Sequence, residues 1–412
     1  MSSYDESGLI YVDGKSYLVD DIAKNHPGGP LFIKMFAGKD ATDAFLTYHR
    51  KPFPSHRVDS SWTGGTATSH TGPYDDYLSL CAEVEKVVPR NKSFAPYSYF
   101  IKISSILGSA LWLEYYMHSN TVYVWYLSAI LGWLYALIGL NIQHDANHGA
   151  ISRHFWINRI LGLTQNWIGG SSISWYHQHV VQHHIHTNDV VLDPDISGTK
   201  LLRLNPLRSW FRFYSLQYIY FFFLISLYGC TAIFDFIGDA WNGTMYTPMS
   251  PLLLNERRFD LICSLGFLVR WIIYPIYVTK NIYTIFHILP MMTVAGYYLA
   301  FFFILSHNFL GTTFHSVNHD DNQTTSLLYR QVSSSCNVGG SWLCFSNGGL
   351  NYQIEHHLFP RMNHTHYPII APIVKQFCKT RGIPYVHYPT VWDNLQSTIS
   401  HLKHLGYSST KY

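Results

Sequence analysis

The sequence predicts an α-helical integral membrane protein with a small α+β domain at its N-terminus. Charged residues make up only 13% of the 412 residues, whereas a soluble globular chain typically has about 25%. Several apolar runs approach the ~20 residues that a helix needs to cross a bilayer. The aromatic content of 17% excludes a disordered chain, and a net charge of +3 gives no reason to expect a nucleic-acid partner.

Residues 1–60 are polar and mixed in composition, and we assign them to the small domain. They contain an HPGG motif, made of His26, Pro27, Gly28 and Gly29. The Pro and the two Gly residues predict a turn that lets the backbone approach a flat cofactor. A second histidine, His49, follows a short predicted helix in which Phe45 is a candidate pocket wall. Two neutral imidazoles on opposite faces are the axial ligands of many b-type haems.

Together these motifs resemble a cytochrome b5 domain over residues 8–60. The resemblance implies a haem b with His26 and His49 as axial ligands, and a role as an electron carrier. It also places the remaining HPGG residues and Phe45 around the cofactor. The alternative is an inert surface histidine in a Pro-Gly turn, which the second histidine and the intervening helix argue against.

Residues 61–96 predict a linker and a surface helix, because a Thr/Gly/Ser run at 61–72 precedes an amphipathic segment at 77–88. The membrane domain then occupies residues 97–412. Within it we predict about four spans, at residues 98–117, 121–140, 215–237 and 284–306.

The segment 259–278 is also apolar, but it contains Arg270 and Pro275. A charge at the bilayer centre costs about 3 kcal/mol, so we expect this segment to be interfacial or only partly inserted. Four spans keep both termini and the intervening polar blocks on one side. No signal peptide is visible, which makes that side the cytosol. The sequon at Asn242 is then expected in a loop on the lumenal side.

Three histidine-rich boxes follow the predicted spans. The boxes contribute seven histidines: His144, His148, His179, His183, His184, His356 and His357. Imidazole suits iron, copper and zinc, and seven ligands are too many for one ion but suit two. Cysteine pairs of the C-x-x-C type are absent from the sequence, which argues against structural zinc and iron–sulfur clusters.

The boxes HDANHGA, QHVVQHHIHTN and NYQIEHHLFPRM resemble those of membrane-bound non-haem di-iron desaturases. The chain is most similar to front-end fatty acyl desaturases, which carry a fused cytochrome b5 domain and begin the third box with Gln. The resemblance covers nearly the whole chain. It implies two iron ions bound by the seven box histidines within a helical cap on the cytosolic side.

The same resemblance gives Gln353 the place of a ligand histidine, as a weak ligand or a hydrogen-bonding group, and makes His307 an extra ligand. The second box has the spacing H-x-x-x-HH where many members have H-x-x-HH, and this spacing keeps His179 and His183 on one face of an α-helix. His177 and His186 receive no role beyond a supporting one. Four acidic residues are candidates either for hydrogen bonds to ligand imidazoles or for turns and caps: Asp145, Asp193, Asp195 and Glu355.

The resemblance implies an enzyme of polyunsaturated fatty acid biosynthesis. It would insert a cis double bond between the carboxyl end and an existing double bond of a C18–C22 acyl chain, carried on CoA or on a lipid. Dioxygen is the oxidant, and electrons come from NAD(P)H through a cytochrome b5 reductase and the fused haem. We expect the endoplasmic reticulum as the location. The position of the new bond, the chain length and the carrier group stay open.

Three alternatives remain at this point. The same iron chemistry would suit a sphingoid long-chain-base desaturase or an acyl hydroxylase. A histidine-lined metal transporter is a more distant alternative, because its ligands should lie within the spans rather than beyond their ends. A haem-bearing electron carrier without catalysis would leave the boxes unexplained.

Overall fold

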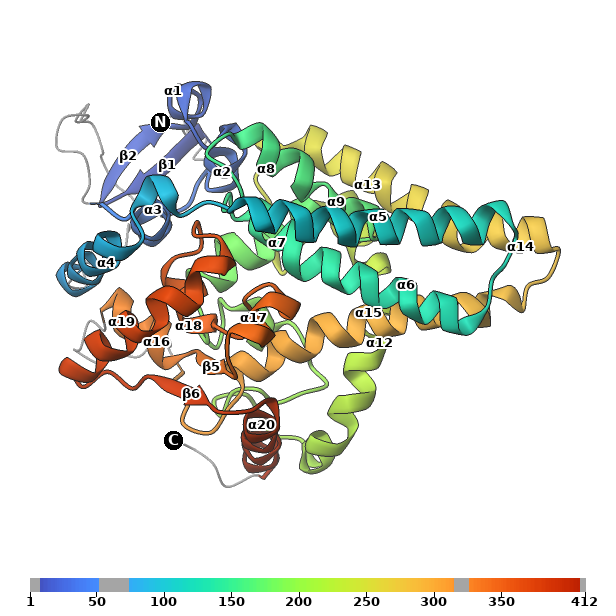
Figure 1. Ribbon diagram of the computed structural model, residues 1–412. Coiled ribbons are helices and arrows are strands. Elements are labelled where there is room, and N and C mark those ends of the chain that lie inside the picture. Colours follow the sequence, from blue (N-terminus) through green and yellow to red (C-terminus); the bar gives the residue numbers. More distant parts are fainter. Residues whose placement is uncertain (1–7, 52–73, 315–325, 408–412) are drawn as a thin grey trace, which may run out of the picture.

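A computed structural model describes residues 8–51, 74–314 and 326–407 of the chain (Figure 1). The predicted linker run at 61–72 lies outside the described residues. The rest is mostly helical, as the sequence predicts, with a small α+β unit at the N-terminal end.

The N-terminal unit begins with a β-hairpin. Strand β1 (Leu9–Val12) pairs antiparallel with β2 (Lys15–Leu18), and the two residues between them, Asp13 and Gly14, both have positive φ, as a tight Asp-Gly hairpin requires. Three short helices follow: α1 (Val19–Asn25), α2 (Pro30–Met35) and α3 (Thr42–His49). Helix α1 ends immediately before His26, and α3 ends with His49, so the two predicted haem ligands sit at helix termini.

The predicted surface helix is α4 (Asp75–Val87). Its apolar face is buried against α19 (Tyr367–Thr380) of the C-terminal region, where Tyr77 and Leu80 share a hydrophobic core with Ile370. The helix that precedes the membrane domain is therefore packed against the C-terminal region.

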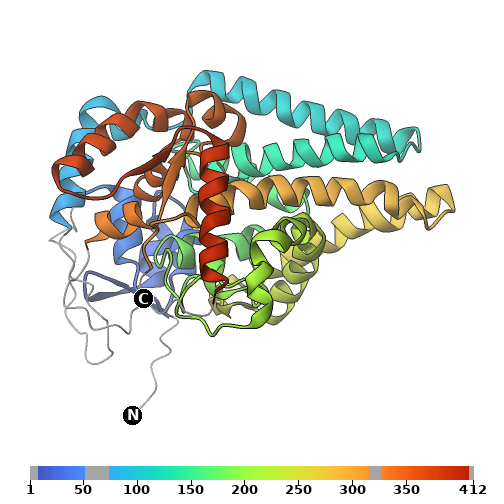
Figure 2. The same ribbon diagram turned by 90° about the horizontal axis from the view of Figure 1, so that it is seen from below.

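Four long helical segments project from the body as two hairpins lying side by side (Figures 1 and 2). The first hairpin is α5 (Tyr97–Ser119) with α6 (Trp125–Ile138). The second joins α15 (Thr284–His307) to a continuous stretch made of α13 (Leu254–Leu268), η7 (Val269–Ile273) and α14 (Tyr274–Thr279). The hairpins touch far from the body, where the rings of His118 and Trp271 are 4.6 Å apart.

Helix α12 (Gln217–Asn242) runs across the direction of these hairpins (Figure 1). The chain that follows it forms β3 (Thr244–Met245) and β4 (Thr247–Pro248). Met245 packs in the same core as Val19 and Met35 of the N-terminal unit. Asn242 therefore lies on the side of the N-terminal unit, and its expected place in a loop on the opposite side is wrong.

Four segments are long and apolar enough to cross a membrane by length and composition: Trp125–Asn147, Arg212–Asn242, Pro251–Thr279 and Thr284–His307. The segment expected to be interfacial is thus as apolar as its neighbours. Arg270 within it is not isolated, because its guanidinium lies 4.0 Å from the Trp167 ring and its Nε 4.0 Å from a Glu114 carboxylate oxygen. The geometry leads us to expect that the two hairpins supply the four spans and that α12 lies at the membrane surface.

A cap of short elements covers the near end of the hairpins. Its first part contains α7 (His144–Asn147), α8 (Phe155–Gly162), α9 (Thr164–Trp167), α10 (Ser172–Trp175), η4 (Tyr176–His183) and α11 (Pro194–Ser197). Its second part contains α16 (Leu327–Ser333), β5 (Cys336–Val338), α17 (Ser341–Asn347), α18 (Gln353–Leu358), α19, β6 (Val386–Tyr388) and α20 (Val391–Leu405). Strands β5 and β6 pair in parallel.

Candidate functional site

Two π-helical stretches set the orientation of the side chains in the first two histidine boxes. Helix α6 continues through a π-helix at Gly139–Gln143 directly into His144. The second box begins in η4, a π-helix that contains His179 and ends at His183, and the amide of His184 donates to the carbonyl of His179, five residues back, at 3.0 Å. Because π-helical turns are rare and concentrate at functional sites, both boxes carry a local signature of function.

The box histidines form two groups of converging ring nitrogens. In each group, the potential ligand atoms all lie within 4.8 Å of one another. The larger group has four members: His144, His148, His179 and His356. The smaller group has three: His183, His307 and His357. All seven side chains are buried, and His307 lies with two box histidines in the smaller group.

His184 stands between the groups. Its Nε2 atom lies 3.1 Å from Nε2 of His179 and 3.0 Å from Nε2 of His356, both in the larger group. Its ring stacks on His357 of the smaller group, with ring centres 4.3 Å apart. The seven predicted ligands and His307 thus occupy one continuous site.

His179 and His183 lie side by side, as their spacing predicts, with ring centres 5.4 Å apart and ring planes 20° from parallel, but they belong to different groups. The π-helical register makes residues five apart neighbours, so His179 turns toward His184 and the larger group. His183 then belongs to the smaller group. The first box is α-helical at this point, since the amide of His148 donates to the carbonyl of His144, and these two side chains stay together.

Several of these nitrogens fit a bound metal better than a hydrogen-bond network. Both ring nitrogens of His144, and Nε2 of His148 and His183, have no hydrogen-bond partner among the described residues. Buried polar atoms without partners are rare unless an ion or water satisfies them. Burial, with neighbouring histidines adding to it, holds the pKa of His148, His179 and His356 well below the ordinary range, which keeps their lone pairs free.

The ring nitrogens that face away from the groups are held by specific partners. His357 Nδ1 lies 2.8 Å from Oε1 of Gln331, and His307 Nδ1 lies 2.9 Å from the Ser334 carbonyl. His148 Nδ1 lies 2.7 Å from Oη of Tyr48. Such partners fix the tautomer and leave Nε2 for a metal. Gln331 lies outside every motif, so nothing in the sequence points to this contact.

Asp193 and Asp195 hold His183. The nearest oxygens of both carboxylates lie 3.1 Å from His183 Nδ1. Burial lowers the pKa of His183, but the two carboxylates outweigh it and raise the value to about 9. Asp193 also caps α11 by accepting from the amide of Asp195. The cap and the imidazole contact, which the sequence left as alternatives, therefore occur in one residue.

The other two acidic candidates do not hydrogen-bond to a box histidine. Asp145 accepts from Nδ1 of His364 at 2.6 Å and from Asn363 at 2.8 Å. Glu355 accepts from Asn337 and from Tyr385, both at 2.7 Å. These contacts fasten the third box to neighbouring chain segments rather than orienting its imidazoles.

Gln353 belongs to the smaller group. Its Nε2 atom is placed 3.0 Å from Nε2 of His307 and 3.2 Å from Nε2 of His357, while Oε1 has no partner among the described residues. A half-turn of the amide group exchanges the positions of its oxygen and nitrogen. The opposite orientation directs the oxygen toward the point where the two histidines converge.

His177 has a structural contact. Its Nε2 lies 3.1 Å from the carbonyl of Thr247 and 2.8 Å from Nε2 of Gln182, which ties η4 to strand β4. His186 lies outside both histidine groups.

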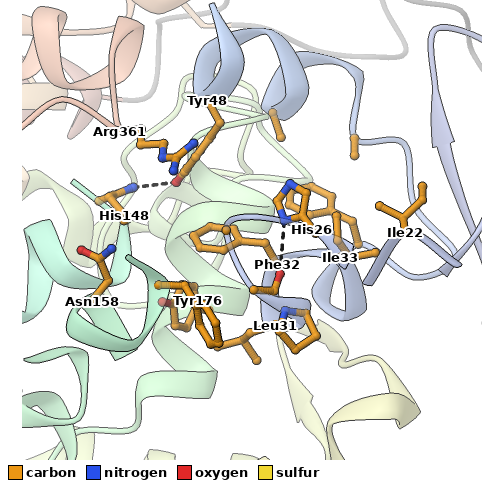
Figure 3. Close-up of a pocket in the computed structure, with 18 of the residues that line it drawn as sticks. Ile22, His26, Leu31, Phe32, Ile33, Tyr48, His148, Asn158, Tyr176 and Arg361 are labelled. Atoms are coloured by element: carbon orange, nitrogen blue, oxygen red, sulfur yellow. Dashed lines mark hydrogen bonds between the residues drawn. The ribbon is translucent and has the colours of Figure 1, made fainter. Parts of the chain in front are cut away.

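A second site lies in the N-terminal unit (Figure 3). The rings of His26 and His49 are centred 5.9 Å apart. Nδ1 of His26 lies 3.2 Å from the Gly29 carbonyl, and Nδ1 of His49 lies 2.9 Å from the Phe45 carbonyl, which leaves both Nε2 atoms available. Phe45 stacks on His49 with ring centres 4.3 Å apart. The two imidazoles therefore lie close together with Nε2 free on each, which suits them as axial ligands of a haem.

The pocket around this pair has a volume of about 440 Å³ and is walled by two parts of the chain. Gly29 is needed there, because its φ is +84° and a Cβ would lie 2.9 Å from the Phe155 ring of α8. The opposite wall belongs to the cap and includes His148, Tyr176 and Arg361 (Figure 3). One member of the larger histidine group, His148, therefore also lines the N-terminal pocket.

A larger cavity, of about 680 Å³, adjoins the histidines from the membrane side. Members of both groups line it, including His144 and His183, and most of the remaining lining is apolar. Gln178 and Asp195 form a polar edge beside the histidines, joined by a hydrogen bond of 2.9 Å. A cavity of this size suits a small-molecule or lipid substrate.

Two family models match the sequence. The model described as "Fatty acid desaturase" matches residues 119–389, and the model described as "Cytochrome b5-like Heme/Steroid binding domain" matches residues 2–77. Together they cover both sites.

Full-length relatives agree with these matches. The chain is 44% identical to an "Acyl-lipid (7-3)-desaturase" of Rebecca salina, over 98% of this chain and 91% of that protein. It is 40% identical to the protein of the same name from Diacronema lutheri, over 97% and 90%. Identity to an "Acyl-lipid (8-3)-desaturase" of Physcomitrium patens is 30%, over 96% and 88%.

Proposed function

The chain belongs to the fatty acid desaturase family and carries a fused cytochrome b5 domain, and from this premise we propose that it is a front-end acyl-lipid desaturase of the (7-3) type. We read the numerals 7 and 3 as an existing double bond at carbon 7 and a new bond three carbons closer to the carboxyl carbon. The new bond is then at carbon 4. The (7-3) relatives of Rebecca salina and Diacronema lutheri are more similar to the chain than the (8-3) relative of Physcomitrium patens is.

The observation that carries the proposal is the convergence of the histidine boxes beside an apolar cavity. We assign the two groups to two iron ions: His144, His148, His179 and His356 hold one, and His183, His307 and His357 hold the other. His184 completes the site between them, and Gln353 contributes its oxygen to the smaller group. Bound iron supplies the dioxygen chemistry that removes hydrogen from an unactivated methylene. The reaction takes two hydrogens from neighbouring carbons. The two electrons that leave with them, together with two electrons and two protons supplied from outside, reduce one dioxygen to two waters.

The chain's own residues hold the acyl group beside the histidines. The apolar cavity excludes water from the reacting methylene, and its polar edge of Gln178 and Asp195 lies next to the smaller group. A new bond at carbon 4 leaves only three bonds between the reacting carbon and the carboxyl carbon. A polar edge so near the metal groups is what such a substrate needs for its ester group.

Haem b, when bound in the N-terminal pocket, would supply the electrons. We propose that His26 and His49 are its axial ligands, while Pro27, Gly28 and Gly29 shape the turn beside it. Arg153, Arg159 and Arg361 line the same pocket and give it the positive charge that suits the two carboxylates of a haem. A cytochrome b5 reductase using NAD(P)H is the proposed donor, and the endoplasmic reticulum, with the histidine boxes facing the cytosol, is the proposed location.

The test is to express the chain in yeast and feed polyunsaturated acids whose first double bond is at carbon 7 or at carbon 8. We expect a product with a new bond at carbon 4, recovered in lipids, from the first acid only. A product with a new bond at carbon 5 would replace the (7-3) assignment. Hydroxylated acids would favour an acyl hydroxylase instead, and altered sphingoid bases would favour a sphingoid long-chain-base desaturase.

His356→Ala is expected to abolish the product and keep the haem Soret band. His287→Ala is the matched control, because this histidine is exposed on α15 and belongs to neither group. Full product from His356→Ala would contradict the iron assignment. The family match already excludes the metal transporter and the electron carrier without catalysis.

A further inference from the structure

The two sites are connected through adjacent residues of one helix. Tyr48 directly precedes the haem-side histidine His49 at the end of α3. The phenolic oxygen of Tyr48 lies 2.7 Å from Nδ1 of His148, a member of the larger histidine group (Figure 3). The two residues that make this contact are 100 positions apart in the sequence.

The local packing fixes Tyr48 in this position. Its ring packs against Phe32 of α2, with centres 5.2 Å apart, and Arg361 lies beside its oxygen (Figure 3). With a metal on Nε2 of His148, the ring proton resides on Nδ1 and is donated to the Tyr48 oxygen. From the His49 ring to the His148 ring, the connection then consists of covalent bonds and this one hydrogen bond.

We propose that Tyr48 is the electron-transfer link between the haem and the larger histidine group. The inference rests on the proposed function, because it needs both cofactors in place. In each transfer, one ferrous haem becomes ferric and one ferric ion of the histidine site becomes ferrous. No covalent bond forms or breaks, and the proton stays between Tyr48 and His148. Two such transfers, each supplied by the reductase, deliver the two electrons of one desaturation.

A second route exists through stacked rings and serves as the competing explanation. It runs from Phe32 to Tyr176 (ring centres 5.3 Å apart), on to Trp175 (5.9 Å), and from there to His179 (4.5 Å). This route crosses three ring contacts without a covalent or hydrogen-bonded link other than the peptide between Trp175 and Tyr176. The Tyr48 route crosses a single hydrogen bond and is the better connected of the two.

The experiment uses the purified full-length protein loaded with haem and iron, in membrane-mimetic discs. The haem is reduced, the protein is mixed with oxygenated buffer and acyl-lipid, and haem reoxidation is followed at the Soret band. Tyr48→Phe keeps the ring and removes the hydrogen bond, so we expect reoxidation to slow several-fold. Tyr48→Leu also removes the ring and should slow it further. The haem midpoint potential should match that of the wild type, and the rates are compared at equal iron content, because Tyr48 also holds a ring nitrogen of His148.

Tyr214→Phe is the matched control. Tyr214 is also buried, and its hydroxyl donates a hydrogen bond of 2.9 Å to the Lys200 carbonyl, away from the haem pocket. It should lose a comparable hydrogen bond and keep the wild-type reoxidation rate. The Soret signal comes only from chains that hold haem, so incomplete folding of a variant would reduce the amplitude rather than the rate.

The outcomes separate this inference from the proposed function. Reoxidation at the wild-type rate in Tyr48→Phe would overturn the role of Tyr48 and favour the ring route. If Tyr48→Phe is slow but forms normal product in a single turnover after chemical reduction of its iron, the role of Tyr48 is supported. If the wild-type protein forms no desaturated product even after chemical reduction, the proposed function itself fails.

Discussion

The Nε2 atoms of His184 and His356 lie 3.0 Å apart, although the two residues come from the second and third boxes. Nε2 of His179 lies 3.1 Å from the same atom of His184. Three neutral imidazoles cannot satisfy one another at a single meeting point, because each has only one ring proton to donate. A cation resolves the conflict, and His184, which also stacks on His357, contacts both histidine groups.

The two groups should bind metal separately. His148→Ala removes a member of the larger group and His357→Ala a member of the smaller one, so each variant should lose about half of the iron. Iron per chain is measured by mass spectrometry on purified protein, with His287→Ala as the control. Complete loss of iron from either variant would show instead that the two groups load as one unit.

Asp193 should control the affinity of the smaller histidine group for iron. Its carboxylate holds Nδ1 of His183, and loss of such a partner typically weakens metal binding by about 10- to 100-fold. We expect this loss in Asp193→Asn when iron is titrated with a chelator. Asp145→Asn is the comparison, because the nearest Asp145 oxygen lies 4.0 Å from Nδ1 of His144. It should reduce thermal stability and retain iron, and equal iron loss in both variants would refute the distinction.

An ion pair fastens the haem domain to the cap. Arg330 of α16 donates to the Asp43 carboxylate of α3 at 2.6 Å, and both side chains are largely buried. A charge-assisted hydrogen bond of this kind contributes about 1.5 to 3 kcal/mol. A double-mutant cycle with Asp43→Asn and Arg330→Gln should recover a coupling energy in this range from thermal unfolding. Additive effects of the two changes would mean that the pair does not help to dock the domain.

The contact between α12 and α15 depends on two glycines that also line the cavity. A Cβ on Gly296 would lie 2.1 Å from the backbone nitrogen of Gly229. Gly296→Ala should therefore separate the helices, cost about 1 to 3 kcal/mol and reduce activity. Gly238→Ala on α12 meets no atom within 4 Å and should stabilise by about 0.5 to 1 kcal/mol. Thermal unfolding and product yield are compared, and normal activity in Gly296→Ala would show that the contact does not shape the cavity.

The C-terminal helix should loosen in acid. Burial, with His404 adding to it, lowers the pKa of His401 on α20 to about 4. A histidine buried in its neutral form gives its full stabilisation above the unfolded pKa of about 6.5 and loses it as the pH falls toward 4, by about 3 kcal/mol at most. Hydrogen exchange in α20, corrected for the intrinsic rate, should therefore accelerate below pH 6.5.

His401→Phe should remove this response, because its ring can keep the stacking on Phe314 without a titratable nitrogen. Exchange in α20 is a local measurement, so loss of iron at low pH elsewhere does not enter it. A pH response in His401→Phe equal to that of the wild type would contradict the assignment.

The sequence predicts the parts of this protein whose signal is local. The HPGG turn and His49, the three boxes and the apolar runs all rest on neighbouring residues, and the structure forms a helix or turn at each. The membrane spans are harder to predict. The free-energy cost of placing Arg270 in a bilayer depends on its contacts with Glu114 and Trp167, and only the fold brings these residues close to it. The division of the second box between two groups depends on a π-helical register that residue spacing alone does not specify.

Tyr48 likewise could not be identified from the sequence as a residue of the functional site. A tyrosine beside a haem-side histidine has no special pattern, and its role depends on a residue 100 positions away. Gln331 is similar, since nothing in its surroundings distinguishes it from other polar residues on a short helix. Contacts made by single residues between distant elements need the folded chain to become visible.

The order of the boxes along the chain also has a consequence for biosynthesis. Proteins are made and generally begin to fold from the N-terminus, so the haem domain and the first two boxes emerge from the ribosome well before α18. Each histidine group includes a residue of α18, His356 in one and His357 in the other. In a nascent chain, both histidine groups therefore lack one member until the third box is translated. Iron loading becomes a late maturation step, and a truncated translation product is left without the means to activate oxygen.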